Sequence, residues 1–345
     1  MNSFTLTVVD IKRETSDACT ICFKQPGLRK IKYKAGQYIT LFFRINGRKY
    51  ARAYSFSSSP NSNSHIEVTV KRVPGGIVSN YVNDELNIGN IVEVSEPLGS
   101  FVVCDSSLFD TIYLWGVGSG ITPLFSIINE LLNTGSNKFI HLIYGNKNVE
   151  STIFYNQLRS LENKYPANFK MTNFYSQDVH FIENNNNIKG RINSDFVASL
   201  ISQDDNLKKS IHYICGPSIL KNLIKSKLVE FEIPPTSILV EEFELTIESS
   251  EFELIKDSSV NIYFQKKEFE IFVPKGKSIL EVALDNDIEI PYSCQTGDCN
   301  TCKVKVHQGQ VKMLGISNKR EDLENNEFLL CCSYPLSSRV ILEVE

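Results

Sequence analysis

A strong excess of charge of either sign is missing from this sequence. Its 345 residues include 36 Lys and Arg against 40 Asp and Glu, a net charge of −4. Proteins that bind nucleic acid usually carry a large basic excess, so we expect no nucleic-acid partner. With 42% apolar and 22% charged residues, the chain is also too apolar to be disordered, and the composition indicates globular domains.

Long apolar runs are missing too. The most apolar stretch, Thr111 to Leu132, is broken by Gly, Ser, Pro, Asn and Glu. A membrane-spanning helix needs about 18 or more apolar residues in a row, so we expect no membrane insertion. The N-terminal residues reach Asp10 without a long apolar core, which argues against a secretory signal peptide. We therefore expect a cytoplasmic protein.

The sequence also shows no set of side chains that could catalyse a reaction without a bound cofactor. The five histidines are scattered without the spacing of metal ligands, and no set of Ser, His and Asp stands out. We therefore expect no catalytic residue in the strict sense, and we expect bound cofactors to supply the chemistry.

Charge is distributed unevenly along the chain. Residues 241–345 hold 11 basic and 20 acidic side chains, a net of −9, which leaves +5 for residues 1–240. At roughly 150 residues per domain, the length predicts two to three domains. An acidic C-terminal module beside a basic remainder fits this division, and it predicts docking of the acidic module on basic partners.

The pattern of apolar residues indicates three domains. Residues 1–103 contain short alternating stretches separated by Gly, Pro, Asn and Ser, which predict an antiparallel β-barrel. In residues 104–243, apolar strands alternate with helical patterns such as Pro123–Leu132 and Ile219–Phe231, as in an α/β domain with a parallel sheet. A charged, Ser-rich linker at 244–258 precedes a small α+β domain at 259–345. The expected barrel strands are Thr5–Val9, Thr20–Phe23, Tyr38–Arg44, Ala51–Ser57, Ile66–Arg72 and Ile91–Ser95.

Nine cysteines, odd in number and clustered, do not look like a disulfide framework. Cys294, Cys299 and Cys302 form a C-x4-C-x2-C run, and the adjacent pair Cys331 and Cys332 follows. Thiolates hold iron in iron–sulfur clusters, and this spacing is that of plant-type [2Fe–2S] ferredoxins. Zinc sites usually combine two C-x2-C pairs, so the longer gap favours the cluster, with a zinc site as the alternative.

Residues 260–345 resemble a plant-type ferredoxin of the β-grasp fold. The cysteines follow the family's order, and the family's ending is present as Cys331-Cys-Ser-Tyr-Pro335. The resemblance implies a cluster bound by Cys294, Cys299, Cys302 and Cys331, because the family's last ligand stands four residues before that proline. Cys332 is the adjacent alternative. Asp298 departs from the family, which has a small residue there.

A second group of motifs lies in the predicted barrel. Arg52-Ala-Tyr54-Ser55 offers a guanidinium for a phosphate and a flat ring for a cofactor ring system. Gly75-Gly76 precedes Ser79 and a predicted short helix, whose N–H groups suit a pyrophosphate. The first motif alone could be an exposed pair of side chains on a strand.

Together these two segments resemble the ferredoxin–NADP reductase family, whose barrel binds flavin. The resemblance implies a phosphate contact for Arg52, ring and ribityl contacts for Tyr54 and a place near flavin N5 for Ser55. The remaining flavin-binding residues that it implies are Lys71, Gly76, Val78 and Ser79. FAD is the flavin we expect, and FMN stays open because FMN-dependent relatives share this domain order.

A glycine-rich turn after an apolar strand predicts a nicotinamide nucleotide site. Gly118, Gly120 and Thr122 are the candidate nucleotide-binding residues of this turn, because the glycines allow close approach of a phosphate. We expect Thr122 as the helix N-cap with Pro123 at the first helical position. The turn lacks the spacing of the Rossmann fingerprint. Tyr144-Gly145-Asn146-Lys147 and Cys215-Gly216-Pro217 follow two other predicted strands.

In the reductase family, the glycine turn and the Cys-Gly-Pro segment flank the nicotinamide. The resemblance therefore implies nucleotide contacts for Cys215, Gly216 and Pro217, and it places Phe243 close to the flavin ring. Cys215 as a buried structural thiol and Phe243 as an ordinary core residue are the alternatives. Lys147 is a candidate for the 2′-phosphate of NADPH or a solvated surface lysine, so the choice between NADH and NADPH stays open.

The three sets of motifs predict an electron-transfer oxidoreductase. Electrons would pass from NAD(P)H through FAD and a [2Fe–2S] cluster to an acceptor protein, because a flavin links a two-electron donor to a one-electron cluster. The resemblance is to reductase components of multicomponent oxygenases, particularly the phenylacetyl-CoA epoxidase reductase type, so an oxygenase component is the expected partner. The alternatives are direct reduction of a small substrate, electron supply to a desaturase, and a redox-sensing module without turnover.

Overall fold

The computed structural model describes residues 3–27, 30–61, 65–103, 109–177, 186–203, 209–316 and 320–344. Internal contacts divide these residues between two compact units. One unit combines Thr40–Ala53 with Glu242–Glu345, and the other combines Ser3–Ile39 with Tyr54–Glu241.

The antiparallel sheet expected in the first hundred residues is confirmed. Six strands follow the order β4-β3-β6-β1-β2-β5, and the short helix α1 (Ile77–Asp84) follows β5. Along β5, Ile66, Val68 and Val70 are completely buried, which is the alternation expected of a strand with one face in a core. The strands are β1 (Ser3–Thr15), β2 (Ala18–Lys24), β3 (Tyr38–Ile45), β4 (Arg48–Ser55), β5 (His65–Lys71) and β6 (Ile91–Ser95).

Strand β1 is longer than the sequence predicts. Its first residues pair with β6, from Ser3 to Thr7. The strand then continues beyond Val9 and pairs with β2 as far as Thr15. Charged residues interrupt the apolar alternation in this second half, so the ladder with β2 extends the strand where the local pattern gives no signal.

The second domain contains the expected parallel sheet, with strand order β10-β9-β8-β7-β11-β12. Neighbouring strands in it pair in parallel, and helices follow the strands. The strands are β7 (Thr111–Val117), β8 (Phe139–Asn146), β9 (Phe169–Tyr175), β10 (Asn187–Lys189), β11 (Ser210–Cys215) and β12 (Ile238–Glu241). The helices are α2 (Ile121–Asn133), α3 (Tyr155–Lys164), α4 (Ser194–Ser202) and α5 (Ser218–Glu230), with 3₁₀ turns at Gly118–Gly120 and Pro235–Ser237.

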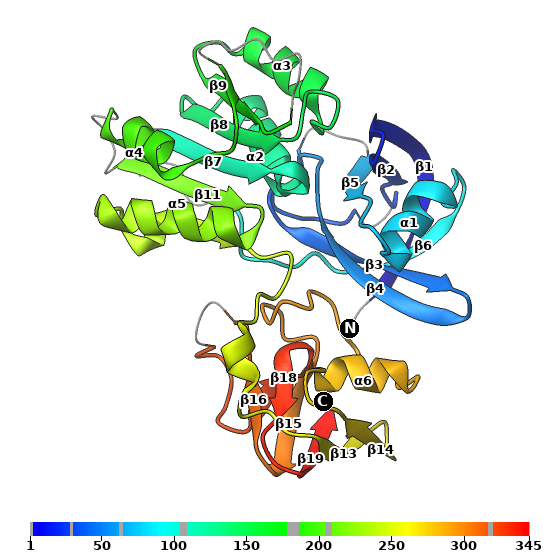
Figure 1. Cartoon of the computed structure of the whole chain (residues 1–345). Helices are drawn as coiled ribbons and strands as arrows, with labels where there is room; N and C mark the ends of the chain where they lie inside the picture. Colours follow the sequence, from blue (N-terminus) through cyan, green and yellow to red (C-terminus); the bar gives the residue numbers. More distant parts are fainter. Residues whose placement is uncertain are drawn as a thin grey trace. The chain divides into compact units, whose positions relative to one another are not determined.

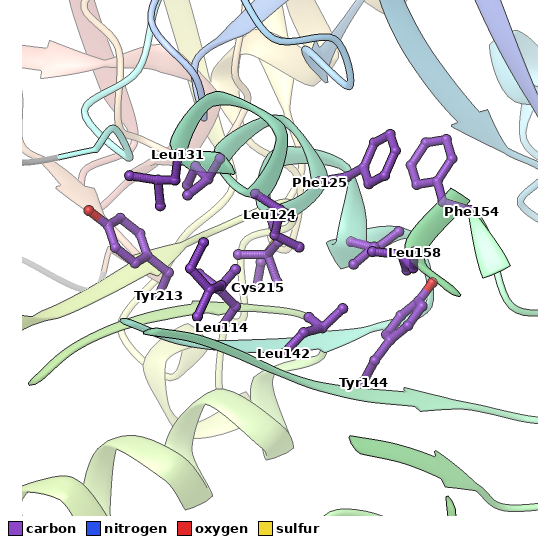
Figure 2. Packing of buried hydrophobic residues seen from close by; sticks show 14 of the residues in the cluster. Leu114, Leu124, Phe125, Leu131, Leu142, Tyr144, Phe154, Leu158, Tyr213 and Cys215 are labelled. Carbon is purple, nitrogen blue, oxygen red and sulfur yellow. The ribbon is translucent and has the colours of Figure 1, made fainter. Parts of the chain in front are cut away.

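Helices cover both faces of this sheet (Figure 1). Leu114 of β7 packs in the cluster that contains residues of α2 and α3, whereas Trp115 packs in the cluster with residues of α4 and α5. Figure 2 shows the first cluster, with Leu114 and Leu142 of the strands facing Leu124 of α2. Burial on both faces explains why these strands are almost continuously apolar.

The predicted start of α2 is wrong. Thr122 is not the N-cap, and Pro123 is the third helical residue, because the helix begins at Ile121 with Gly120 as its N-cap. The 3₁₀ turn of Gly118–Gly120 runs directly into the helix. Proline is tolerated at that position because the first N–H groups of a helix lack intrahelical partners in any case. The Thr122 hydroxyl instead donates to the Ser119 carbonyl at 3.1 Å.

The C-terminal domain has a five-stranded mixed sheet in the order β14-β13-β19-β15-β17. The strand β13 is antiparallel to β14 and parallel to β19. Helix α6 (Ile279–Asp285) packs on this sheet, and Ser278 caps its start because Ser278 Oγ accepts the Glu281 N–H at 3.2 Å. The strands of this sheet are β13 (Ser258–Phe264), β14 (Lys267–Val273), β15 (Lys303–Gln308), β17 (Glu327–Leu329) and β19 (Arg339–Val344). Two short strands, β16 (Val311–Met313) and β18 (Ser333–Pro335), pair with each other in a separate antiparallel sheet.

The stretch predicted as a linker, residues 244–258, carries secondary structure of its own. It contains a 3₁₀ turn at Ser249–Phe252, and its Ile255 is buried against Leu314 and Tyr334 of the C-terminal domain. No helix within the described ranges is long and apolar enough to cross a membrane.

Candidate cofactor and cluster sites

The cysteine run forms a loop between α6 and β15 in which thiols gather. Cys294 Sγ accepts hydrogen bonds from the backbone N–H groups of Thr296, at 3.4 Å, and Cys299, at 3.3 Å. The thiols of Cys299 and Cys331, together with these N–H groups, hold the pKa of Cys294 well below its ordinary value. The neighbouring Cys331 also lowers the pKa of Cys302. These contacts therefore favour negative charge on Cys294 and Cys302, whereas the neighbouring thiol of Cys294 raises the pKa of Cys299.

Side-chain interactions link the thiols of Cys294 and Cys299, of Cys294 and Cys331, and of Cys302 and Cys331, and Cys331 also interacts with Cys332. Within the described ranges, no three His, Cys, Asp or Glu side chains converge on a position for a single metal ion. A [2Fe–2S] cluster takes two thiolates at each iron, so four cysteine thiols are a complete ligand set for it. The donor set thus suits a [2Fe–2S] cluster.

The neighbouring cysteines 331 and 332 have different surroundings. The Cys331 thiol meets those of Cys294 and Cys302, which raise its pKa. The Cys332 side chain is completely buried and donates to the Leu329 carbonyl at 3.4 Å. Of the two, Cys331 is the one whose thiol contacts both Cys294 and Cys302.

Within the same unit, the hairpin of β3 and β4 contacts the residues that precede Cys294. The hydroxyls of Thr40 and Ser293 lie 2.6 Å apart, and Tyr292 Oη accepts the Ala51 N–H at 2.9 Å. Arg52 follows Ala51 on β4, is half-buried, and donates to the Ala51 carbonyl at 2.8 Å. The predicted flavin-binding arginine therefore directly follows a backbone contact with the cysteine loop.

Charge complementarity supports this contact. Arg48 of β4 lies 3.1 Å from Asp285, and Arg44 of β3 lies 3.7 Å from Glu289. In both pairs the acidic residue comes from the C-terminal part of the chain, as the expected docking of that part on basic residues requires. Because all four side chains are exposed, these pairs contribute little stability, about 0–1 kcal/mol each.

Ser55, at the end of β4, has a hydroxyl suited to a bound partner. Its side chain is 4% exposed, and among the described residues its Oγ has no hydrogen-bond partner. Leaving such a buried group unsatisfied costs about 1–3 kcal/mol. A flavin ring nitrogen beside Ser55 would remove this penalty, so the structure fits the expected cofactor. Tyr54, the preceding residue, is half-buried.

The Gly75-Gly76 segment leads into α1, as expected for a pyrophosphate site. No described side chain caps the first turn of α1, and uncapped N–H groups at a helix start suit an anion. Val78 and Ser79 lie in this turn. The Ser79 hydroxyl accepts the Val73 N–H at 3.1 Å and so fixes the loop that precedes the helix. A Cβ on Gly76 would lie 2.6 Å from this hydroxyl, which explains the glycine.

Lys71 links the barrel to the glycine-rich turn inside the second unit. Its Nζ lies 3.6 Å from Asp17 Oδ2 and 3.7 Å from where a Cβ on Gly118 would be. Gly118 has φ +55°, and its carbonyl accepts the Tyr144 hydroxyl at 2.9 Å. The sequence alone does not predict that Tyr144 holds the glycine-rich turn. The one feature that could have indicated it is an aromatic residue directly before Gly145.

Gly120 lies against the Cys-Gly-Pro segment, as the expected nicotinamide site requires. A Cβ on Gly120 would be 2.2 Å from the Cys215 carbonyl oxygen and 3.1 Å from the Gly216 nitrogen. The Cys215 side chain itself is completely buried among Leu114, Leu124 and their neighbours (Figure 2). This burial agrees with the alternative interpretation, in which the Cys215 side chain is a structural thiol. Pro217 is the N-cap of α5.

Phe243 lies just beyond β12 and belongs to the first unit. Its side chain is 42% exposed, so Phe243 is not an ordinary core residue of the described structure. A partly exposed aromatic ring is consistent with a stacking role, which stays a prediction.

Basic residues lie at the carboxyl ends of β8 and β10, the two neighbours of β9 in the sheet. Lys147, Lys189 and Arg191 are all exposed there. Backbone hydrogen bonds join the segments: the Gln177 N–H donates to the Lys147 carbonyl and the Gly190 N–H to the Tyr175 carbonyl, each at 2.8 Å. Ligands of open parallel sheets bind at this edge, so the corner is placed for part of the nucleotide.

Comparison with known proteins agrees with these three sites. Residues 5–103 match the oxidoreductase FAD-binding domain, residues 114–226 the oxidoreductase NAD-binding domain, and residues 262–336 the 2Fe-2S iron-sulfur cluster binding domain. The expectations of FAD, of a nicotinamide nucleotide and of a [2Fe–2S] cluster are thereby confirmed. The boundaries at 103, 243 and 258 and the individual site residues stay predictions.

Similar proteins match nearly the whole chain. The ferredoxin reductase component of 3-ketosteroid-9-alpha-monooxygenase from Rhodococcus rhodochrous is 30% identical over 99% of this chain and 97% of its own. A component of the 1,2-phenylacetyl-CoA epoxidase from Escherichia coli K12 is also 30% identical, with the same coverage. The structure of phthalate dioxygenase reductase shares the fold, with a TM-score of 0.69 at 21% identity over 99% of this chain and 98% of that one. The chain therefore belongs to the family of oxygenase reductase components, which carry FAD-binding, NAD-binding and 2Fe-2S domains.

Proposed function

We propose that this protein passes electrons from a reduced nicotinamide nucleotide, through FAD and a [2Fe–2S] cluster, to an oxygenase component. The observation that carries the proposal is the cysteine loop, in which Cys294 Sγ accepts two backbone N–H groups, in a chain that matches 2Fe-2S, FAD-binding and NAD-binding domains. The bound flavin supplies the conversion between a two-electron donor and a one-electron cluster. The chain's own residues bind and orient these groups.

On the flavin, Arg52 pairs with a phosphate and Tyr54 contacts the ring and ribityl chain. The Ser55 hydroxyl, which lacks a described partner, donates to or accepts from the ring near N5. The uncapped first turn of α1, with Gly76, Val78 and Ser79, binds the pyrophosphate. Lys71 adds a positive charge beside the glycine-rich turn.

On the nucleotide, Gly118 and Gly120 let the backbone approach the bound molecule closely, and Gly216 and Pro217 form the opposite wall. Cys215 contributes through its backbone and through packing under the turn, since its side chain is buried. At the cluster, Cys294, Cys299, Cys302 and Cys331 would be the ligands, and the family resemblance assigns Phe243 to the flavin ring. Each of these assignments rests on the family resemblance together with the contacts described above.

An acidic cluster domain fits an acceptor with a basic docking surface, as the net charge of residues 241–345 indicates. The compartment we propose is the cytoplasm. All eight described cysteines are free thiols, as expected where disulfides do not persist.

The first test is an anaerobic visible spectrum of the purified protein before and after addition of NADPH or NADH. We expect flavin bands and a broad iron–sulfur shoulder, both of which lose intensity on addition of the nucleotide. A colourless protein from a cofactor-replete preparation, without iron and without a response to either nucleotide, would refute the proposed function.

The basic corner leads us to propose NADPH as the preferred donor. NADPH differs from NADH by a 2′-phosphate, which adds negative charge, and Lys147 and Arg191 supply positive charge at the sheet edge. Hydrogen bonds to charged groups contribute about 1.5–3 kcal/mol, so a double Lys147→Gln, Arg191→Gln variant should lower the NADPH to NADH ratio of kcat/KM by about tenfold or more.

The matched control is Lys170→Gln, at the amino end of β9 and therefore at the opposite edge of the sheet. This change should leave the ratio unaltered. Equal kcat/KM values for both nucleotides in the wild type, or a ratio that ignores the double substitution, would contradict the NADPH assignment.

A further inference from the structure

Arg320 ties a distant segment of the chain to the cysteine loop. Its guanidinium donates to the Gly297 carbonyl and to Asn300 Oδ1, both inside the loop between Cys294 and Cys302. On its other side it donates to both carboxylate oxygens of Asp322, at 2.8 Å each. Asp322 in turn accepts from Asn300 Nδ2 at 3.0 Å. Three side chains and one backbone carbonyl thus form a closed network.

The loop needs such an attachment because its backbone is unusual. Gln295 has φ +60° and Gly297 has φ +75°, and for a residue other than glycine that region is sparsely populated. A backbone of this kind persists when surrounding contacts hold it. On the inner side, Gly297 packs so closely that a Cβ would lie 2.6 Å from Ile316 Cγ2. On the outer side, Arg320 supplies the contacts.

Arg320 also carries a fixed positive charge close to the thiols. Its side chain is only 14% exposed, so water screens it poorly. Hydrogen bonding to Asp322 raises the pKa of Arg320, and Asp298 acts in the same direction. Because Arg320 contacts Asn300, which directly follows Cys299, the guanidinium lies close to a predicted ligand. A cation in that position favours additional negative charge on whatever the thiols bind.

We propose that Arg320 is a positioning residue for the cluster: it holds the cysteine loop in its binding shape and, by its charge, raises the reduction potential. This inference rests on the proposed function, because it presupposes a cluster on the four thiols. It assigns two separable effects to one side chain. The planar fork of hydrogen bonds sets the retention of iron, and the charge sets the potential.

The test compares Arg320→Lys and Arg320→Gln with the wild-type holoprotein. The measurements are the rate of iron release to an excess of an iron chelator and the midpoint potential of the cluster. Charge-assisted hydrogen bonds are strong, so both variants should release iron at least about tenfold faster. Only Arg320→Gln should shift the potential to more negative values, because lysine keeps the charge.

Two further variants keep the test decisive. Arg339→Gln removes an exposed arginine at the start of β19 and should change neither quantity. Asn300→Ala removes one acceptor and leaves Arg320 in place, so it should give an intermediate release rate even if Arg320→Gln does not fold. If Arg320→Lys and Asn300→Ala release iron as slowly as the wild type, the inference is overturned. The proposed function would still stand in that case, because the wild-type protein would hold its cluster. A wild-type protein without iron would instead refute the proposed function itself.

Discussion

Cys331→Ser is expected to remove the cluster while FAD stays bound. The Cys331 thiol interacts with those of Cys294 and Cys302, so its loss removes one of the four predicted ligands. Changes to groups that merely support a metal ligand already lower affinity about 10–100-fold, so loss of a direct ligand should reduce iron retention by more than about a hundredfold. Iron and sulfide analysis of the purified variant measures this directly.

Cys331→Ser should separate reduction of the flavin from electron transfer to a one-electron acceptor. NAD(P)H should still bleach the flavin bands, whereas reduction of a one-electron acceptor such as cytochrome c should fall to the background rate. The adjacent Cys332→Ser variant is the matched control, since Cys332 donates to the Leu329 carbonyl and a serine hydroxyl can do the same. Loss of iron in Cys332→Ser together with full retention in Cys331→Ser would reverse the ligand assignment.

Gly120→Ala is expected to disable the nucleotide site and to destabilise the second unit. The new Cβ would lie 2.2 Å from the Cys215 carbonyl oxygen and 2.6 Å from its carbon, and backbone atoms cannot rotate away as a side chain can. Overpacking of a close contact typically costs about 1–3 kcal/mol. The displaced turn should also abolish reduction of the flavin by NAD(P)H at nucleotide concentrations that saturate the wild type.

Thermal unfolding and anaerobic stopped-flow reduction measure the two effects of Gly120→Ala. Gly27→Ala is the control, because a Cβ at Gly27 meets no atom within 4 Å. If Gly120→Ala has the unfolding temperature and the flavin-reduction rate of the wild type, the close approach between the turn and β11 does not explain the glycine at this position.

Motifs with fixed local spacing could be predicted from the sequence. The C-x4-C-x2-C run indicates its chemistry because three ligands come from one loop, and alternation or helical periodicity indicates the three domain types. The start of α2 could not be predicted in the same way. Thr122 and Pro123 are good residues for a helix start, but the 3₁₀ turn of Gly118–Gly120 already provides one, and Thr122 Oγ1 donates to Ser119 instead.

Contacts between distant segments were beyond the reach of local patterns. Arg320 lies in no recognisable motif, and its attachment to Gly297 and Asn300 depends on how the chain returns to the loop. The Tyr144 hydroxyl reaches the Gly118 carbonyl across two neighbouring strands. The second half of β1 is another case, because pairing with β2 keeps it extended despite its charged residues. In each case, pairing or packing with another segment determines a contact or a strand length that the local sequence does not specify.

The contact of the β3–β4 hairpin with the cysteine loop has a consequence for biosynthesis. Thr40 leaves the ribosome 253 residues before Ser293, its hydrogen-bonding partner. At roughly 5–20 residues per second, the hairpin waits on the order of ten to fifty seconds for that partner. All four predicted ligands are made later still, since each follows Ser293 in the chain. Iron loading is therefore a late step in the maturation of this protein, taken after the flavin-binding strands have been synthesised.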